Sequence, residues 1–146
     1  MGVVYFALMN ISSPKKLTLN KHGAGSIGYL TAPTIGEIPF RIRHVFWTYF
    51  TPERITRGRH AHKKTSIVLF ALSGRIIVAT EMLDGTKKTF VLDKPNVGLF
   101  IPPMVWHIQR YSHTAIQIAL ASRPYNEKEY IRDYKKFISY KKHTKE

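Results

Sequence analysis

From Ile38 onward, the chain alternates between short apolar runs and turn-forming residues. The runs are rich in β-branched and aromatic residues, and Gly, Pro, Asn and Asp separate them, which is typical of short strands. Asp84-Gly85 is the strongest hairpin turn, because both residues tolerate a positive φ. The predicted strands are Phe40–Phe50, Ser66–Leu72, Arg75–Thr80 with a continuation to Leu83, Lys88–Leu92, Gly98–Ile101, Val105–Arg110 and Thr114–Ala121. Many short strands at this spacing predict an all-β fold, an antiparallel sandwich or a small barrel.

The C-terminal region has a different pattern. Asn126 followed by Glu129 resembles a capping box, and apolar residues recur at helical spacing from Tyr130 to Ile138. This arrangement predicts one C-terminal helix packed on the β-body. No linker divides the chain, so residues 1–146 are expected to form a single domain.

The N-terminal segment Met1–Asn10 has an apolar patch, with no basic residue before it and no small-residue cleavage site soon after. It is therefore predicted to be a first strand rather than a signal peptide. Lys15–Ser26 is predicted to be a loop. No stretch approaches the roughly 20 apolar residues of a membrane helix, so we expect a cytoplasmic protein that does not associate with membranes.

Composition narrows the function more than the fold. The hydrophobic content of 44% and aromatic content of 12% exclude a disordered chain. The 23 Lys and Arg residues against 9 Asp and Glu residues give a net charge of +14, which favours an anionic partner. No nucleic-acid-binding motif is present, so nucleic acid is not the expected partner. Cysteine is absent, which excludes a disulfide scaffold, a thiolate zinc site and a cysteine nucleophile.

The densest polar cluster, Arg57–Lys64, contains His60 and His62. On an extended chain, side chains two residues apart point to the same face, so the two imidazoles would lie side by side. His107, which follows Pro102-Pro103, is a third candidate. Histidine titrates near neutrality and also binds metals, so this set suits proton transfer or a metal site. The alternative is that these histidines have no functional role and lie on an edge strand, exposed to solvent.

The histidine spacing resembles the cupin pattern, in which His-x-His is followed by Pro-x-Gly-x-x-His. Here Ser66 stands where the first cupin motif has a carboxylate, and Met104 replaces the glycine of the second motif. Since the carboxylate ligand is missing, metal-free acid–base chemistry is favoured. A metal-binding cupin that uses His60, His62 and His107 stays open as an alternative.

Three segments are together similar to the nucleotide-sugar 3,4-ketoisomerase family. They read RGxHAHKK from Arg57, VGLFIPPxxWH from Val97 and ASxxYxxxxYIRxY from Ala121. The resemblance covers residues 28–137 and leaves 138–146 as a basic tail. It implies a cupin jelly-roll barrel, a homodimer with exchanged N-terminal strands, and neither a metal nor another cofactor.

The resemblance also implies a reaction and its residues. The family isomerises dTDP-4-keto-6-deoxyglucose to the dTDP-3-keto-6-deoxyhexose, on a route to 3-amino-3,6-dideoxyhexoses for O-antigen or S-layer glycans. By resemblance, His60 and His62 are the catalytic pair. We expect His60 to be the base that acts on the sugar. We expect His62 to be its partner, which relays the proton or has an orienting role. The expected substrate-binding residues are Arg57, Arg59, Lys63, Trp106 and His107, the arginines because their fork suits a diphosphate.

Some positions depart from the family pattern. Ser66-Ile67 stands where relatives commonly carry Glu-Gln, and Ile27 stands at a polar position, so either the substrate differs or the activity is weakened. A non-catalytic cupin-like binding module, built on the basic excess, is the second alternative. Trp47 is a candidate to stack on a nucleobase. Four further residues are expected to dock the C-terminal helix or a second subunit: Tyr125, Tyr130, Arg132 and Tyr134.

Overall fold

The structure is a computed structural model that describes residues 13–20 and 37–143. Its elements in chain order are β1 (Lys15–Thr18), β2 (His44–Thr48), β3 (Thr56–His62), β4 (Ile67–Ser73), β5 (Ile76–Glu81), β6 (Lys87–Leu92), β7 (Val97–Ile101), β8 (Trp106–Tyr111), β9 (Ile116–Ala121), a 3₁₀ turn (Glu127–Glu129), β10 (Tyr130–Ile131) and α2 (Tyr134–His143). No helix within this part of the chain has the length and apolar character to span a bilayer.

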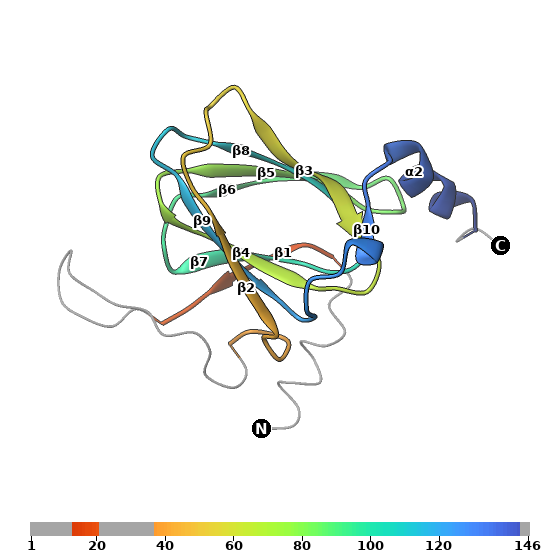
Figure 1. Ribbon diagram of the computed structural model, residues 1–146, viewed down its shortest axis with the longest axis horizontal. Helices are drawn as coiled ribbons and strands as arrows, with labels where there is room; N and C mark the ends of the chain where they lie inside the picture. Colours follow the sequence, from red (N-terminus) through yellow and green to blue (C-terminus); the bar gives the residue numbers. More distant parts are fainter. Residues whose placement is uncertain (1–12, 21–36, 144–146) are drawn as a thin grey trace.

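The strands form two antiparallel sheets that pack face to face (Figure 1). The first sheet has the order β1-β7-β4-β9-β2, and the second has the order β10-β3-β8-β5-β6. In each sheet, strands far apart in sequence are neighbours, as in a jelly roll. The predicted all-β barrel with a C-terminal helix is therefore confirmed.

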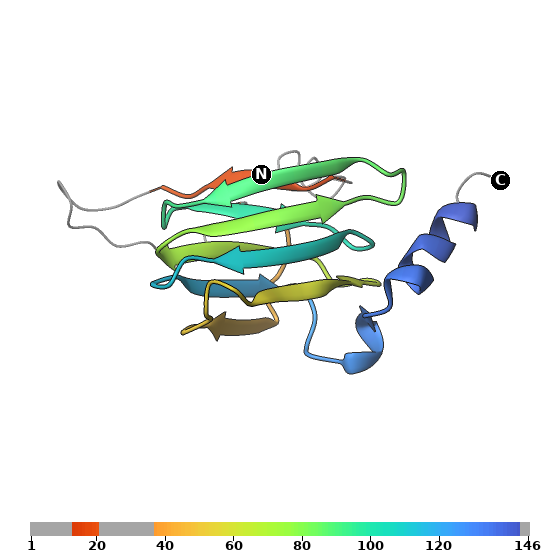
Figure 2. The ribbon, with the colours of Figure 1, turned by 90° about the horizontal axis from the view of Figure 1, so that it is seen from above.

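Strict alternation along the strands sorts side chains between the inside of the barrel and its two outer faces. Residues from both sheets, such as Leu69 and Val78, form the core between the layers. Their neighbours on the first sheet, including Val68 and Phe70, face outward and pack under Ile38. On the second sheet, the outward residues pack against α2, which Figure 2 shows beyond one end of the strands.

The predicted hairpin at Asp84-Gly85 is confirmed. Gly85 has a φ of 90°, and Met82 donates its backbone N–H to the Thr86 carbonyl at 2.9 Å. The turn joins β5 to β6 in continuous register from Ile76 opposite Leu92 to Glu81 opposite Lys87. The hydrophobic pattern and the turn residues thus determine this part of the sheet.

Two strand predictions need correction. Lys15–Thr18 is not a loop, because it pairs with β7 as an edge strand whose lysines stay exposed. Edge strands are held by main-chain hydrogen bonds and carry charged residues, so they lack a strong apolar signal. Strand β3 lies between β10 and β8 and was not among the predicted strands, because Arg57–His62 is mainly polar. The predictions for Met1–Asn10 and Ile27 lie outside the described residues.

The start of the C-terminal helix also needs correction. Asn126 caps only the single 3₁₀ turn, accepting from the Lys128 N–H, while Tyr130 belongs to strand β10. The cap of α2 is Asp133, whose Oδ1 accepts from the backbone N–H groups of Lys135 at 2.8 Å and Lys136 at 3.3 Å. Helix α2 includes residues 138–143, which were expected to be a basic tail.

Candidate active site

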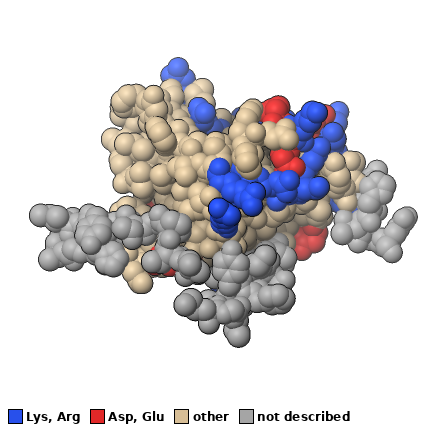
Figure 3. All heavy atoms as spheres, turned by 60° about the horizontal axis from the view of Figure 1, so that its bottom comes forward, with Lys and Arg blue, Asp and Glu red and all other residues tan. Residues whose placement is uncertain are grey.

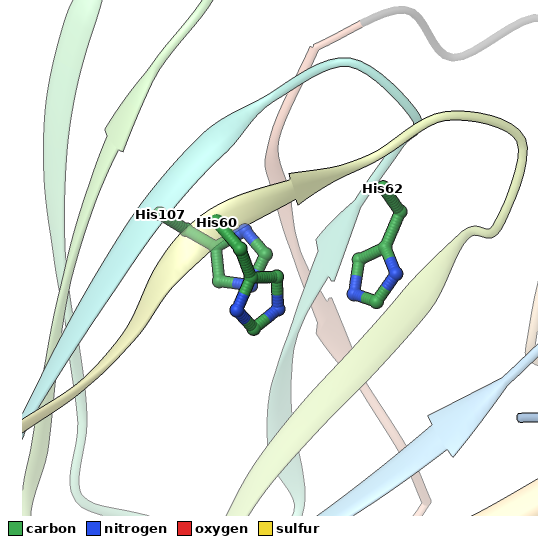
Figure 4. A group of neighbouring side chains, drawn as sticks. All are labelled: His60, His62 and His107. Carbon is green, nitrogen blue, oxygen red and sulfur yellow. The ribbon is translucent and has the colours of Figure 1, made fainter. Parts of the chain in front are cut away.

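Three histidines come together inside the barrel because β3 and β8 are paired. His60 lies opposite His107 in the register, and His62 follows two residues along β3 (Figure 4). The ring centroids of His60 and His62 are 4.9 Å apart, and those of His60 and His107 are 4.6 Å apart. His62 and His107 are both buried. The predicted grouping of these side chains on an inward face is therefore what the structure has.

A β-bulge sets the position of His60. The register between β3 and β8 shifts between Gly58 and His60, where Gly58 has a φ of 78° and Arg59 a φ of 56°. A Cβ on Gly58 would overlap the side-chain oxygen of Gln109 and lie 2.8 Å from the His107 carbonyl oxygen. Glycine is thus required by both the backbone conformation and the available space.

Backbone carbonyls fix the tautomers of two of the rings. The Nδ1 of His60 lies 3.0 Å from the Gly58 carbonyl, and the Nδ1 of His107 lies 3.1 Å from the Val105 carbonyl. A carbonyl can only accept, so each Nδ1 carries the proton and each Nε2 carries a lone pair. The Nε2 of His107 and the Nδ1 of His62 are buried without a hydrogen-bond partner among the described residues.

Burial keeps all three imidazoles neutral at pH 7. Desolvation lowers the pKa of His60 to about 4, despite the hydrogen bond to Gly58. Desolvation lowers the pKa of His62 to about 3, and electrostatic interaction with His60 and Arg132 adds to the decrease. The pKa of His107 is well below its usual value, again mainly because of burial. Neutral rings with free lone pairs are proton acceptors, so the cluster can act as a general base.

The histidines line a cavity of about 430 Å³. Arg57 and Arg132 contribute positive charge to its wall, and Trp47, which is 64% exposed, stands at its rim. The other lining residues are Phe46, Thr48, Gly58, Ile67, Leu69, Gln109, Tyr111, Gln117 and Tyr130. The cavity is in the size range of small-molecule sites and combines apolar walls with a few polar groups.

Tyr130 and Arg132 line this cavity, whereas they were expected to dock the C-terminal helix or a second subunit. Tyr130 pairs with His62 across β10 and β3, and its ring contacts both His60 and His62. The sequence signal was available, because both residues stand in the YIRxY motif, but their helical spacing with Tyr134 concealed the strand. Tyr134 does dock the helix, since it donates to Glu81 at 2.9 Å and packs against Trp106.

Three of the expected substrate-binding residues do not line the cavity. Trp106 precedes His107 on β8, so alternation places it on the outer face, where it packs against Tyr134 and Phe137. The Arg59 guanidinium bonds to Thr56 Oγ1 outside the cavity. Lys63 is also absent from the cavity wall. Arg57 and His107 do line it, as expected from the sequence.

The three imidazoles are also a possible metal-binding group. One nitrogen from each of His60, His62 and His107 lies within 4.8 Å of the others. Three histidines are a common ligand set of catalytic zinc sites. The geometry therefore permits both acid–base chemistry and coordination of a divalent cation.

A second hollow, of about 420 Å³, lies outside the barrel. Four exposed cations line it, from the segment before β2, the β3–β4 turn and the segment after β9: Arg41, Arg43, Lys64 and Arg123. Figure 3 shows Lys and Arg side chains gathered on the face that comes forward when the bottom of Figure 1 is turned to the viewer. No ion pair with a carboxylate is found for these four within the described part of the chain. We call this feature the basic hollow.

Comparison with known proteins gives a consistent result. Residues 4–142 match the FdtA family, described as WxcM-like, C-terminal. Over 106 residues, the chain is 40% identical to the TDP-4-oxo-6-deoxy-alpha-D-glucose-3,4-oxoisomerase of Aneurinibacillus thermoaerophilus, which covers 71% of this chain and 75% of that protein.

Solved structures are similar as well. A 3,4-ketoisomerase from Helicobacter canadensis superposes with a TM-score of 0.83 at 33% identity, covering 88% of this chain and 97% of the other. QdtA, a sugar 3,4-ketoisomerase from Thermoanaerobacterium thermosaccharolyticum solved with TDP, superposes with a TM-score of 0.85 at 29% identity, covering 92% and 98%. The similarity extends over nearly the whole length of these structures.

Proposed function

The chain belongs to the FdtA family of WxcM-like C-terminal domains, and on this basis we propose that it is a sugar-nucleotide 3,4-ketoisomerase. Its substrate is dTDP-4-keto-6-deoxyglucose, and its product is the dTDP-3-keto-6-deoxyhexose. The observation that carries the proposal is the group of three neutral imidazoles at the wall of a ligand-sized cavity. A structure of QdtA, at 28% identity, contains TDP-4-keto-6-deoxyglucose, which supports this substrate class.

The reaction moves a ketone from C4 to C3 of the sugar. The Nε2 of His60, whose lone pair is exposed by the Nδ1 bond to Gly58, removes the C3 proton. The electron pair forms an enediol between C3 and C4, and the proton returns at C4. In this proposal His62 is the partner ring that orients the sugar or relays a proton, and His107 borders the same space.

The nucleotide part of the substrate needs positive charge and an aromatic surface. Arg57 and Arg132 lie on the cavity wall, and their guanidinium groups suit a diphosphate. Trp47 at the rim offers a largely exposed indole on which the thymine ring can stack. We therefore place the sugar beside the histidines and the nucleotide toward the rim.

Three further features belong to this proposal. The chain acts as a homodimer with exchanged N-terminal strands, as the family resemblance implies. It works in the cytoplasm and supplies a 3-keto sugar for amination, on a route to deoxyamino sugars of cell-surface glycans such as O-antigen or S-layer. Light scattering on the purified chain tests the dimer: a mass near twice 16.9 kDa supports it, and a monomer mass contradicts it.

Incubation with dTDP-4-keto-6-deoxyglucose in D₂O, followed by NMR of the product, tests the activity. The expected product has its ketone at C3, and the deuterium content at C4 measures how far the proton carried by His60 exchanges with solvent before it is delivered. The configuration at C4 follows from the same spectra. Unchanged substrate after long incubation at high enzyme concentration would contradict the proposal.

A metal-binding cupin is the second candidate, because the three imidazole nitrogens are close enough to share an ion. Metal analysis of the purified chain and activity after chelation separate the two candidates. Isomerase activity that is unchanged by chelation supports metal-free catalysis. Activity that is lost on chelation and restored by one divalent metal supports the metal centre.

A non-catalytic binding module is a third candidate, favoured by the basic hollow. Such a module would bind phosphate-rich ligands with an affinity that falls steeply with salt and would leave the sugar unchanged. The NMR experiment excludes it if turnover is seen.

A further inference from the structure

Tyr130 occupies a central position beside the two histidines of the proposed catalytic pair. Its ring centroid lies 4.9 Å from that of His60 and 4.6 Å from that of His62. The side chain is half-buried and lines the cavity. No hydrogen bond from its hydroxyl to another described residue is found. The phenol therefore stands at the cavity with no acceptor for its proton among the residues that the structure describes.

A fixed cation covers the face of the same ring. The Arg132 Cζ lies 4.4 Å from the Tyr130 centroid. Two bonds hold this guanidinium to the Glu127 carboxylate, at 2.5 Å and 3.1 Å, and the Tyr125 hydroxyl donates to the same carboxylate at 2.7 Å. The guanidinium is therefore oriented before any ligand enters, and it favours negative charge on the neighbouring phenol.

Burial keeps this phenol protonated at rest. Desolvation raises the pKa of Tyr130, Glu127 adds to the increase, and Arg132 opposes it. At neutral pH the group is an acid that can give up a proton transiently, with the Arg132 charge next to the phenolate.

The proposed reaction needs such a group. Ketone migration moves one hydrogen from C3 to C4 and a second from the C3 oxygen to the C4 oxygen. His60 can carry only the carbon-bound proton, because its Nδ1–H is tied to Gly58. The Nδ1–H of His107 is tied to Val105, and the Tyr111 hydroxyl already donates to Gln117 at 3.0 Å. Tyr130 is the remaining phenol at the wall of the cavity.

We propose that Tyr130 is the second acid–base group of this site, acting on the sugar oxygens. This inference rests on the proposed function. As His60 removes the C3 proton, the C3–H electron pair forms the C3–C4 double bond, and the C4 oxygen takes the phenol proton. The phenolate then removes the proton from the C3 oxygen, the C3 carbonyl forms, and protonated His60 returns its proton to C4. Both residues end in their starting states, and His62 orients the sugar.

The test is Tyr130→Phe, with Tyr134→Phe as the matched control, because the Tyr134 phenol bonds to Glu81 and does not line the cavity. We expect kcat of Tyr130→Phe to fall about 100-fold, the scale of general acid–base catalysis. KM and the Kd for TDP should change less than about threefold, because the ring and its contacts remain. Tyr134→Phe should keep kcat within about threefold, since its hydroxyl donates to Glu81 on the helix side of the second sheet.

The pH profile separates an acid from a structural residue. The kcat of the wild type should decline at alkaline pH, where the phenol ionises, and Tyr130→Phe should lack this decline. Fluorotyrosine at position 130 keeps the ring and lowers the phenol pKa, so the decline should move to lower pH even if Tyr130→Phe folds poorly.

The outcomes distinguish this inference from the proposed function. If the wild type does not isomerise the substrate, the proposed function fails. If the wild type is active, a kcat of Tyr130→Phe within threefold of wild type overturns the role of Tyr130. The role of Tyr130 is also overturned if fluorotyrosine at position 130 does not shift the alkaline decline of kcat to lower pH.

Discussion

Two hollows of nearly equal size differ in the titratable side chains that line them. The histidine cavity of about 430 Å³ contains three desolvated, neutral imidazoles on two paired strands, and backbone carbonyls fix two of them. The basic hollow of about 420 Å³ is lined by exposed cations that no described carboxylate neutralises. Both hollows are large enough for a ligand, so volume does not identify the active site. The active site is identified instead by desolvated titratable groups with fixed tautomers, which are the groups suited to exchange protons with a bound sugar.

The largest expected effect is at His60. His60→Asn removes the proposed base, so exchange of the C3 hydrogen with solvent should fall by about 10³-fold or more, within the range of general-base catalysis. TDP binding should change little, because the nucleotide is placed toward the rim. His113→Asn, at an exposed turn, is the matched control. Deuterium exchange followed by NMR measures the effect, and undiminished exchange in His60→Asn would remove His60 as the base.

The bulge at Gly58 is the next most sensitive point. In Gly58→Ala, the new Cβ meets Gln109 and His107 at a positive φ, so we expect several kcal/mol of destabilisation and loss of activity. Gly85→Ala is the control, because Gly85 also has a positive φ but no atom within 4 Å of the added Cβ. Its expected cost is about 1 kcal/mol. Urea unfolding compares the two, and equal losses would mean that close packing at the bulge does not matter.

Acid should destabilise the chain through the histidine cavity. The unfolded histidines titrate near pH 6.5, whereas the folded pKa values are about 4 for His60 and about 3 for His62. Between these pH values the unfolded chain binds more protons than the folded chain. The contribution of these two histidines to the free energy of unfolding is therefore fully present above pH 6.5 and is lost as the pH falls toward 3. His60 alone accounts for up to about 3 kcal/mol, at about 1.4 kcal/mol per pKa unit.

Unfolding curves at pH 7, 5.5 and 4 measure this dependence. The stability of His60→Gln should vary less with pH than that of the wild type, and His113→Gln should behave like the wild type. If His60→Gln loses stability as steeply as the wild type between pH 6.5 and 4, the cavity does not desolvate this ring.

The smallest effect is expected at the basic hollow. The double variant Arg43→Glu and Arg123→Glu changes the local charge by four units but leaves the histidine cavity intact. At physiological salt, kcat/KM should stay within about threefold of wild type, with a larger decrease at low salt, because exposed charges act by screened steering. Arg54→Glu with Arg110→Glu is the control for net charge. A tenfold loss confined to the first pair would place substrate binding in the basic hollow.

The sequence predicted much of the fold because apolar runs and turns were unambiguous where both faces of a strand are buried. Strands β4, β7 and β9, which are mostly buried, follow this pattern closely. The edge strand β1 and the polar strand β3 do not show this pattern, because main-chain pairing rather than apolar side chains holds them in place. The helix start was predicted too early, because Tyr130, Ile131 and Tyr134 fit a helical period although the first two lie on a strand.

The histidine set itself could be predicted from residue types and spacing. His60 and His62 are two residues apart on an extended segment, and this spacing alone places both rings on one face. His107 joins them only because β8 pairs with β3 in one particular register. Alternation along β8 turns Trp106, which is adjacent to His107, away from the cavity and against Phe137.

What the sequence alone determined is local: the turns, the alternation, and two imidazoles on one face of a strand. Tertiary structure decided which face became the interior, and therefore which groups lost water and had their pKa lowered. It also brought Tyr130 and Arg132 to the histidines, through a two-residue strand that is too short to show the periodicity of a strand. The physical reason is that burial and charge–charge contacts depend on distances between segments far apart in the chain, which no local pattern encodes.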